Sequence, residues 1–449
     1  MKNPNRLSKT LTDFGGTIMK LNYKRTLLVG LAFLSICTFW QAYDGIIPLI
    51  LENTFNVGET ATGQIMAIDN ILALFMLPLF GSLSDKTHTP LGKRSPYIIF
   101  GTIVAVISMM FLPYFDNTEN LLGFALCLGM TLLAMATYRS PAVSLMPDVT
   151  PKKLRSKGNA VINLMGAVGG VISLALISLL VPKEGKPNYF PIFAIIAGIM
   201  IGAVIILVLT VRENKLVKEM EETGGYESTE EELNEEHSKG KKMSKDVFKS
   251  LIFMLLCVAF FFIGYNAVTT FFSLYMTNFL EVKGGSFANY LMVATVSSIA
   301  FYLPSGLIAT KFGRKKAVMI GLCVMASCFL VMSFFRSAGA HLLPFFVIIG
   351  CGYACVIVNT FPIIWEMSQG SDIGKYTGYY YTASMSAQII TPMVAGFLME
   401  NLDNYGVLFP YAVLAELISL AMLMQVKHGD SKPVKSVDKL EAFDVGGDD

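Results

Sequence analysis

The chain carries twelve separate runs of apolar residues, each about as long as a helix must be to cross the hydrocarbon core of a bilayer. They lie at approximately residues 27–51, 62–84, 96–113, 121–143, 159–181, 190–211, 249–276, 287–309, 317–335, 341–365, 376–397 and 407–425. Only 15% of the residues are charged, against roughly 25% in soluble domains, so one water-soluble core could not take up this much apolar surface. Because backbone polar groups inside a bilayer must be satisfied within the chain, each run is predicted to be a helix. The predicted fold class is an all-α membrane protein with twelve transmembrane helices.

Lysine and arginine are distributed very unevenly between the two sides of these spans. If the N-terminus lies on side one, the tails and loops of that side hold 30 of the 35 basic residues, and the loops of side two hold four. Basic residues collect in cytoplasmic loops. The sequence therefore predicts a multi-pass protein of the cell membrane with both termini in the cytoplasm.

One hydrophilic segment, at 212–248, divides the spans into two sets of six. Its glutamates come first and its lysines follow, which indicates a charged cytoplasmic linker and leaves a regulatory docking role open. The predicted organisation is a cytoplasmic tail (1–26), a six-helix bundle (27–211), the linker (212–248), a second six-helix bundle (249–425) and a cytoplasmic C-terminal tail (426–449).

The two sets of six repeat one another at corresponding loops. The loop after the second run reads GSLSDKTHTPLGKR, and the loop after the eighth reads SGLIATKFGRKK. Both place a glycine next to basic residues, as Gly92-Lys93-Arg94 and as Gly313-Arg314-Lys315. Two six-helix repeats around a central cavity are typical of secondary transporters.

Charges at the ends of these spans can form pairs that hold one conformation and break in the other. We predict that such a conformational latch is formed by Gly81, Asp85, Gly92, Lys93, Arg94, Asp148, Gly313, Arg314 and Glu366. The alternative is that these charges only fix the topology.

The stretch from Asp85 to Pro96 follows the pattern D-x-T-x-[ST]-x-x-G-[KR]-x-x-P. This pattern resembles the major facilitator superfamily, and within it the glycoside–pentoside–hexuronide:cation symporter family and the plant-type sucrose transporters. A second stretch, SPAVSLMPDVTPKKLRSKGNAVINLMGAVGG, is similar to the junction between the fourth and fifth spans of those transporters. The aspartate pair that melibiose-type members carry on the second span aligns here with Ala73 and Leu77. The resemblance implies secondary active transport by alternating access, as proton- or sodium-coupled symport of a glycoside or oligosaccharide.

Ionisable residues inside a span are functional candidates, because each costs about 2.5–3.5 kcal/mol to insert. They are Asp44, Asp69, Arg139 and Glu416. We predict that Asp44 and Asp69 couple transport to the ion. A structural Asp44–Arg139 pair, a hydrated Asp69 near the outer interface and a structural Glu416 are the alternatives.

Polar and aromatic residues on the same spans are predicted to bind the substrate. A sugar presents an apolar C–H face that aromatic rings cover and hydroxyls that polar groups bind. The predicted substrate-binding residues are Trp40, Gln41, Tyr43, Asp44, Asn70, Tyr138, Arg139, Tyr265, Asn266, Asn359 and Gln388. Gly166 and Gly170 are predicted to pack helices together.

No phosphate-binding loop, metal-ligand spacing or nucleophile motif is found in the sequence. We therefore expect no enzymatic activity, no metal and no cofactor other than the coupling proton or sodium ion. The expected partners are a small-molecule substrate, predicted to be a sugar, and the lipid bilayer; no nucleic acid is expected, and we expect a functional monomer. Transport of a non-sugar solute such as a drug, an amine or a metabolite is the alternative, followed by a non-transporting membrane sensor.

Overall fold

The computed structural model describes residues 21–151, 154–222, 244–367 and 373–430. Across these ranges twelve helices are long and apolar enough to cross a membrane. The predicted all-α fold with twelve spans is confirmed.

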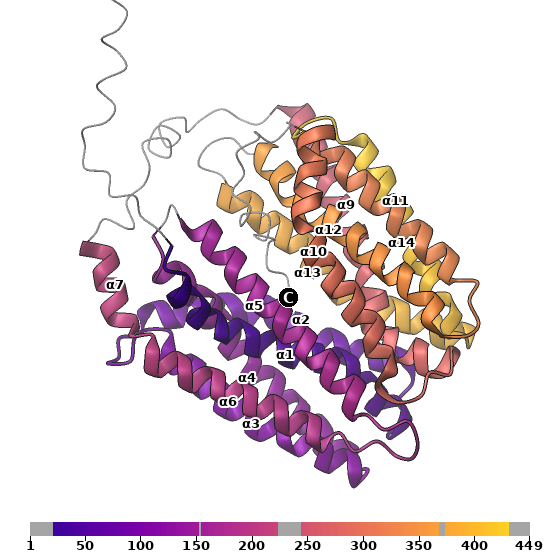
Figure 1. Cartoon of the computed structure of the whole chain (residues 1–449), viewed down its shortest axis with the longest axis horizontal. Helices are drawn as coiled ribbons and strands as arrows, with labels where there is room; N and C mark the ends of the chain where they lie inside the picture. The colour runs from indigo at the N-terminus through magenta and orange to yellow at the C-terminus, as the bar shows by residue number, and fades with distance from the viewer. Residues whose placement is uncertain (1–20, 152–153, 223–243, 368–372, 431–449) are drawn as a thin grey trace, which may run out of the picture.

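The first six spans form one bundle, drawn in indigo to magenta in Figure 1. They are α1 (Tyr23–Asn53), α2 (Glu59–Lys86), α3 (Ser95–Asn117), α4 (Leu121–Asp148), α5 (Arg155–Leu180) and α6 (Phe190–Thr210). A short helix, α7 (Glu213–Glu222), follows at once. The beginning of the expected linker is therefore helical, and residues 223–243 lie outside the described part of the chain.

The last six spans form the second bundle, drawn in pink to yellow in Figure 1. They are α9 (Lys245–Leu274), α10 (Ala288–Phe312), α11 (Arg314–Met332), α12 (Leu343–Met367), α13 (Ile373–Leu402) and α14 (Leu408–Gln425). Four short turns adjoin them: η3 (Tyr275–Phe279), η4 (Gly284–Phe287), η5 (Ala340–Leu342) and η7 (Tyr405–Val407). In both bundles the third span packs on the fourth and on the sixth, so the repeat seen in the sequence is also a repeat of helix packing.

Local signals explain where several helices begin. Side-chain oxygens of Asn22, Asn120 and Ser244 accept hydrogen bonds from backbone N–H groups in the first turns of α1, α4 and α9. Prolines lie in the first turns of α3 and α6. The first N–H groups of a helix have no partner within it, so the N–H that proline lacks is not needed there. The helices also continue past the apolar runs, so that Asp148 and Glu366 lie in the last turns of α4 and α12.

The outer surface of α3 carries a continuous apolar stripe. Phe100, Ile103, Ile107, Phe111 and Tyr114 are all exposed, and Phe100 has 63% of its surface uncovered. Their spacing of three and four residues places them on one face of the helix. Such a stripe has no partner within the described chain and fits the hydrocarbon of a bilayer.

The two bundles meet through α2 on α13 and through α5 on α10. The closest approaches lie at glycines. A Cβ atom on Gly63 would come within 2.0 Å of the Pro392 carbonyl oxygen, and one on Gly396 within 2.2 Å of the Glu59 oxygen. These contacts join the bundles at the start of α2 and the end of α13, and the bundles diverge toward the opposite end, where the first and last described residues lie (Figure 1).

Candidate functional site: the central cavity

A cavity of about 230 Å³ lies between the two bundles. Its walls come from α1, α2, α4 and α5 on one side and from α9 to α13 on the other. Nine of the residues predicted to bind substrate or ion line it: Trp40, Gln41, Asp44, Asp69, Asn70, Arg139, Tyr265, Asn266 and Gln388. The fold thus brings residues from five separate spans to one place.

The wall from the first bundle is polar and charged. The Arg139 guanidinium carbon lies 6.0 Å from the centre of the Trp40 ring, within the range of a cation–π contact. Asn70 Nδ2 donates a hydrogen bond of 2.9 Å to Asp69 Oδ1. With Asp44, this wall holds two carboxylates and one guanidinium.

The wall from the second bundle has no charged residue among those that line the cavity, and it carries several aromatic rings. The Tyr265 and Tyr353 rings lie 4.5 Å apart, and Phe261 stacks on Tyr265 with ring centres 6.0 Å apart. Tyr302 also lines the cavity. The sequence interpretation missed Tyr353 and Tyr302, because an aromatic residue within an apolar run gives no signal of whether it packs or faces a cavity.

Two donors from opposite walls have no hydrogen-bond partner in the described chain. They are the buried indole N–H of Trp40 and the buried amide nitrogen of Asn266. Because an unsatisfied buried donor costs about 1–3 kcal/mol, a ligand with acceptor oxygens would be stabilised beside them.

Three predicted substrate-binding residues do not line this cavity. Tyr138 is fully buried, and its hydroxyl contacts the Ser35 hydroxyl and lies 2.9 Å from the Ala32 carbonyl oxygen, joining α4 to α1. Asn359 Nδ2 donates to the Cys355 carbonyl oxygen at 2.9 Å within α12. Tyr43 is buried beside Phe39, because successive residues of a helix point about 100° apart and Asp44 takes the cavity face.

The glycines predicted to pack helices have separate positions. A Cβ atom on Gly166 would lie 2.6 Å from the Phe33 ring, so this glycine permits the contact of α5 with α1. Gly170 lines the cavity, where a Cβ atom would lie 3.6 Å from Gln41 Oε1. Glu416 lies outside the cavity, fully buried on α14, and its carboxylate oxygens have no partner in the described chain.

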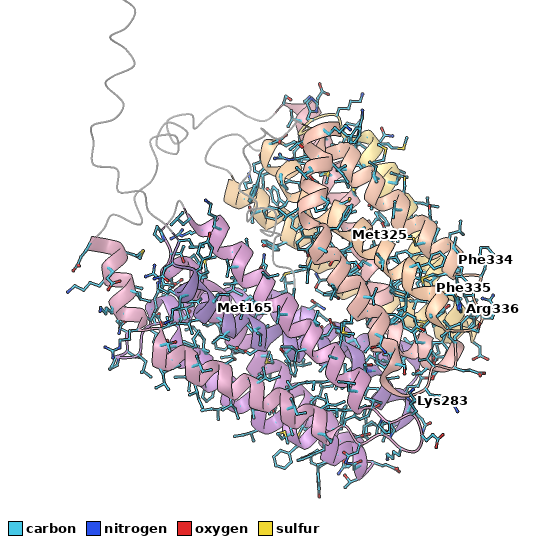
Figure 2. The ribbon with its side chains drawn as sticks, viewed as in Figure 1. Met165, Lys283, Met325, Phe334, Phe335 and Arg336 are labelled. Atoms are coloured by element: carbon cyan, nitrogen blue, oxygen red, sulfur yellow. The ribbon has the colours of Figure 1, made fainter. Side chains whose placement is uncertain are left out.

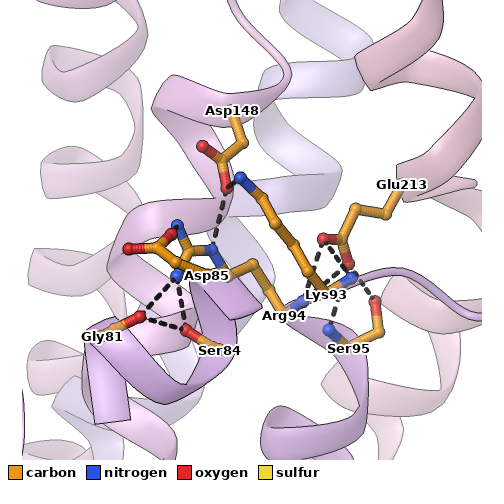
Figure 3. Close-up of polar contacts among 8 residues, drawn as sticks. All are labelled: Gly81, Ser84, Asp85, Lys93, Arg94, Ser95, Asp148 and Glu213. Carbon is orange, nitrogen blue, oxygen red and sulfur yellow. Dashed lines mark hydrogen bonds and ion pairs between the residues drawn. The ribbon is translucent and has the colours of Figure 1, made fainter. Parts of the chain in front are cut away.

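A cluster of charges connects the end of α2, the start of α3 and the end of α4 (Figure 3). Because α1 begins at Tyr23 and α2 runs back toward that start, the cluster lies on the side of the described termini. The Arg94 side chain has 5% exposure, and its Nε donates to Asp148 Oδ2 at 2.8 Å. Its other nitrogens contact Asp85, the Ser84 hydroxyl and the Gly81 carbonyl oxygen. Lys93 Nζ lies 3.1 Å from Asp148 Oδ2. Gly81, Asp85, Lys93, Arg94 and Asp148, all predicted latch residues, therefore meet at one place.

The second bundle has a corresponding pair. Arg314, at the start of α11, contacts Glu366 in the last turn of α12. Gly313 precedes it with a φ of 98°, a conformation that glycine adopts without steric cost, as Gly92 does before Lys93 with a φ of 119°. Each cluster joins helices of its own bundle.

Several hydrogen bonds that cross between the bundles lie at the opposite end of the molecule. Glu52 accepts from Asn278 and from the Tyr405 hydroxyl, and the Thr60 N–H donates to Glu400 Oε2 at 2.8 Å. Ser178 Oγ donates to Asn289 Oδ1 at 2.8 Å. The bundles are therefore closed together at this end.

Lys283 and Arg336, two of the four basic residues assigned to side two, lie at this closed end of the second bundle (Figure 2). On the first bundle, exposed Lys186 donates to Glu119 Oε1 at 2.9 Å. This hydrogen bond lowers the pKa of the Glu119 carboxyl.

A family model described as "MFS/sugar transport protein" matches residues 30–369. The chain belongs to this family of transporters. The resemblance to the major facilitator superfamily is confirmed, and the chain is a transporter rather than an enzyme.

Relatives of this MFS transporter share modest identity with it. An uncharacterized MFS-type transporter of Methanocaldococcus jannaschii is 22% identical over 383 residues, which are 84% of this chain and 89% of that protein. An uncharacterized protein of Bacillus subtilis is 27% identical over 42% of this chain and 44% of its own length. A lactose permease of Lactobacillus helveticus is 26% identical over 33% of this chain, and that match spans 26% of the permease.

Solved transporters share the fold of this MFS member. The xylose transporter XylE from E. coli, in an inward open conformation, superposes with a TM-score of 0.64 and 14% identity, covering 94% of this chain and 98% of the other. A mutant of the nucleoside transporter NupG superposes with a TM-score of 0.63 and 14% identity, covering 89% and 99%. These likenesses concern the fold alone.

Proposed function

We propose that this transporter carries a glycoside or oligosaccharide by alternating access, in symport with a proton or a sodium ion. The observation that carries this proposal is the pairing, across one cavity, of a charged wall with an uncharged wall that carries several aromatic rings. Rings such as Tyr265 and Tyr353 suit the apolar C–H face of a sugar, and groups such as Gln41 and Asp44 suit its hydroxyls.

The unsatisfied donors of Trp40 and Asn266 support the same substrate class. They belong to opposite bundles, so a ligand that accepts from both would be contacted by both halves of the transporter. A sugar offers many hydroxyl oxygens that can accept hydrogen bonds from such donors. The partial matches to a lactose permease and to sucrose transport proteins of Arabidopsis thaliana and Oryza sativa agree with this substrate class.

The charges of the cavity support coupling to a monovalent cation. Among the lining residues, Asp44 and Asp69 face one cation, Arg139, which leaves one negative charge in excess when both acids are ionised. In a site of low dielectric constant an unbalanced charge is costly, and one proton or one sodium ion would balance it. We therefore propose Asp44 and Asp69 as the ion-coupling residues.

We propose that the side of the described termini faces the cytoplasm, because 30 of the 35 basic residues fall on that side. The closed end then faces outward, and the conformation described is inward-facing. Residues 27–211 and 249–425 would move as two bodies. The two charge clusters would act as the latch between the states.

Trp40 offers a direct test of substrate binding, because the chain has only two tryptophans. Trp365 lies at the end of α12 and donates to Thr377 Oγ1 at 3.1 Å, and it does not line the cavity. In a Trp365→Phe variant, lactose, sucrose or another member of a sugar panel is expected to change the Trp40 emission with saturation. The matched Trp40→Phe variant, which keeps Trp365, is expected to show no change. An equal response in both variants, or no response to any sugar, would count against the proposed site.

A further inference from the structure

The carboxylate of Glu213 is buried beneath the start of α3, although the sequence places it in a charged linker. Its Oε1 accepts the backbone N–H groups of Lys93 at 2.8 Å and Arg94 at 2.9 Å. Its Oε2 accepts the N–H and the hydroxyl of Ser95 at 3.1 and 2.8 Å (Figure 3). The first N–H groups of a helix have no partner within the helix, and a negative charge is favourable beside them. Glu213 is therefore the N-terminal cap of α3, supplied by the residue that opens α7.

The second bundle has the same arrangement at the corresponding position. Asp430 follows α14, the sixth span of its bundle, just as Glu213 follows α6. Asp430 Oδ1 accepts the backbone N–H of Lys315 at 2.8 Å, in the first turn of α11. A Cβ atom on Gly313 would lie 3.0 Å from the same oxygen, and one on Gly92 would lie 2.1 Å from Glu213 Oε2. In both bundles an acid after the sixth span caps the third span at a glycine that makes room for it.

Each capped turn carries the arginine of a charge cluster. Arg94 receives the Glu213 cap on its own N–H while its side chain contacts Asp85 and Asp148. Arg314 immediately precedes the capped N–H of Lys315 and contacts Glu366. Fixing the backbone of this turn fixes the point from which each guanidinium reaches its carboxylates.

Further contacts hold these turns in place. Asn214 Nδ2 donates to the carbonyl oxygens of Thr89 and Pro90, at 2.8 and 3.1 Å, in the loop before α3. Lys315 Nζ donates to the Val426 carbonyl oxygen at 2.6 Å, just after α14. The exit of the sixth span is therefore joined to the start of the third span by more than the acid alone.

We propose that Glu213 and Asp430 are matched positioning residues, which hold the arginine of each charge cluster in the conformation that opens toward the termini. The inference rests on the alternating access proposed above, and it concerns neither the sugar nor the coupling ion. Both clusters are intact in the conformation described, and under the latch proposed above they break in its counterpart, so loosening a cap weakens the conformation described relative to that counterpart.

Cavity accessibility tests this proposal without any substrate. In a cysteine-free background, a single cysteine replaces Thr295 on the cavity wall, and its reaction with an impermeant maleimide is followed from the side of the termini. Glu213→Gln puts an amide NH₂ where an acceptor oxygen is needed, so we expect the reaction to slow by roughly tenfold. Glu222→Gln is the matched control: Glu222 lies on the same helix, forms an exposed pair with Lys218 and is expected to leave the rate unchanged.

A double-mutant cycle separates positioning from general stability. Arg94→Gln is expected to slow labelling about as much as Glu213→Gln, and the double variant is expected to add little, because the cap acts through the arginine. Fully additive effects, or wild-type labelling in Glu213→Gln, would overturn the proposal.

The second bundle provides an independent pair of variants, which also serves if Glu213→Gln does not fold. Asp430→Asn keeps a capping oxygen and is expected to label like the parent, whereas Asp430→Ala is expected to slow roughly fivefold. Equal rates for these two variants would contradict the proposal. If the protein binds no sugar while the labelling follows the expected pattern, the proposed substrate is wrong and the proposed role of the two caps still holds.

Discussion

At the scale of single residues, the polar wall of the cavity sets what the transporter can couple. Asp44, Asp69 and Arg139 share this wall, and their charges do not balance when both acids are ionised. Binding of a cation and binding of a substrate at one wall affect each other, because each changes the field in which the other binds.

The first prediction concerns Asp44. If protons couple transport, Asp44→Asn reproduces the protonated side chain in shape and charge. We expect this variant to lose gradient-driven accumulation. Its dissociation constant for substrate is expected to stay within about threefold of the wild-type value, which is a smaller change than the loss of one neutral hydrogen bond would cause. Accumulation and equilibrium binding are measured on the same reconstituted protein. Normal accumulation would remove Asp44 from the coupling site.

Asp69→Asn is the matched test of the second acid. Asp69 Oδ1 accepts from Asn70, and the amide oxygen of an asparagine at this position can accept the same hydrogen bond. We expect this variant to impair coupling as well, by at least about tenfold in the accumulation ratio, since with either acid neutral the other balances Arg139 and no excess negative charge is left for the coupling ion. If Asp44→Asn accumulates substrate and Asp69→Asn does not, Asp69 is the coupling residue. The reverse result would assign coupling to Asp44.

Part of this site could be predicted from the sequence, for an energetic reason. A charge in an apolar run is costly, so Asp44, Asp69 and Arg139 stood out, and all three line the cavity. Tyr353 and Tyr302 did not stand out, because aromatic residues are common in membrane spans. Tyr138 was predicted to bind substrate because it precedes Arg139 in the sequence. The sequence gives no sign that its hydroxyl instead contacts Ser35 and the Ala32 carbonyl oxygen on α1.

At the scale of helices, the ends of the spans hold the connections that the apolar runs do not reveal. The runs mark only the hydrocarbon region, whereas α4 and α12 continue to carboxylates that pair beyond it. Glu213 lies about 120 residues from its partners in the sequence, so no local pattern could assign its role as the cap of α3.

Asp85 tests the first charge cluster. Its carboxylate contacts Arg94 and is 58% exposed, so solvent screens the pair and the interaction is modest. We expect Asp85→Asn to slow transport by about fivefold and to leave equilibrium substrate binding intact, since the cavity residues are unchanged. A folded variant that binds no substrate would instead place Asp85 in the binding site or in the fold.

Gly396 tests the close approach of α13 to α2. A side chain there would press on the Glu59 carbonyl oxygen, so we expect Gly396→Val to destabilise the closed end by about 1–3 kcal/mol and to lower the unfolding midpoint in detergent. Gly198→Val is the control, because no atom from another helix of the described chain lies within 4 Å of the Cβ position at Gly198. Equal midpoints in the two variants would show that this contact does not hold the bundles together.

At the scale of the whole molecule, the architecture could be predicted almost completely, because hydrophobic length and the repeat of six determine it. Twelve spans, two sets of six and a repeated loop were all present as patterns in the sequence. The conformational state could not be predicted, since it depends on cross-bundle contacts such as those of Glu52 and Thr60.

The orientation in the membrane is tested by thiol labelling at two exposed positions, one at the end of α3 and one in the loop after α2. A cysteine at Asn117, at the closed end, is expected to react with an impermeant reagent from outside the cell. A cysteine that replaces His88, beside the first charge cluster, is expected to react only after the membrane is permeabilised. The reverse pattern would overturn the orientation drawn from the basic residues.

The central claim, cation-coupled sugar transport, is tested most directly by uptake into proteoliposomes that contain the purified full chain. A panel of glycosides and oligosaccharides is supplied with an imposed proton gradient, an imposed sodium gradient or neither. We predict that at least one sugar accumulates above its external concentration under one of these gradients, and that accumulation collapses when the gradient is dissipated. Uptake of a non-sugar solute with none of the sugars transported would contradict the account. Sugar uptake that is unchanged by either gradient would contradict it as well.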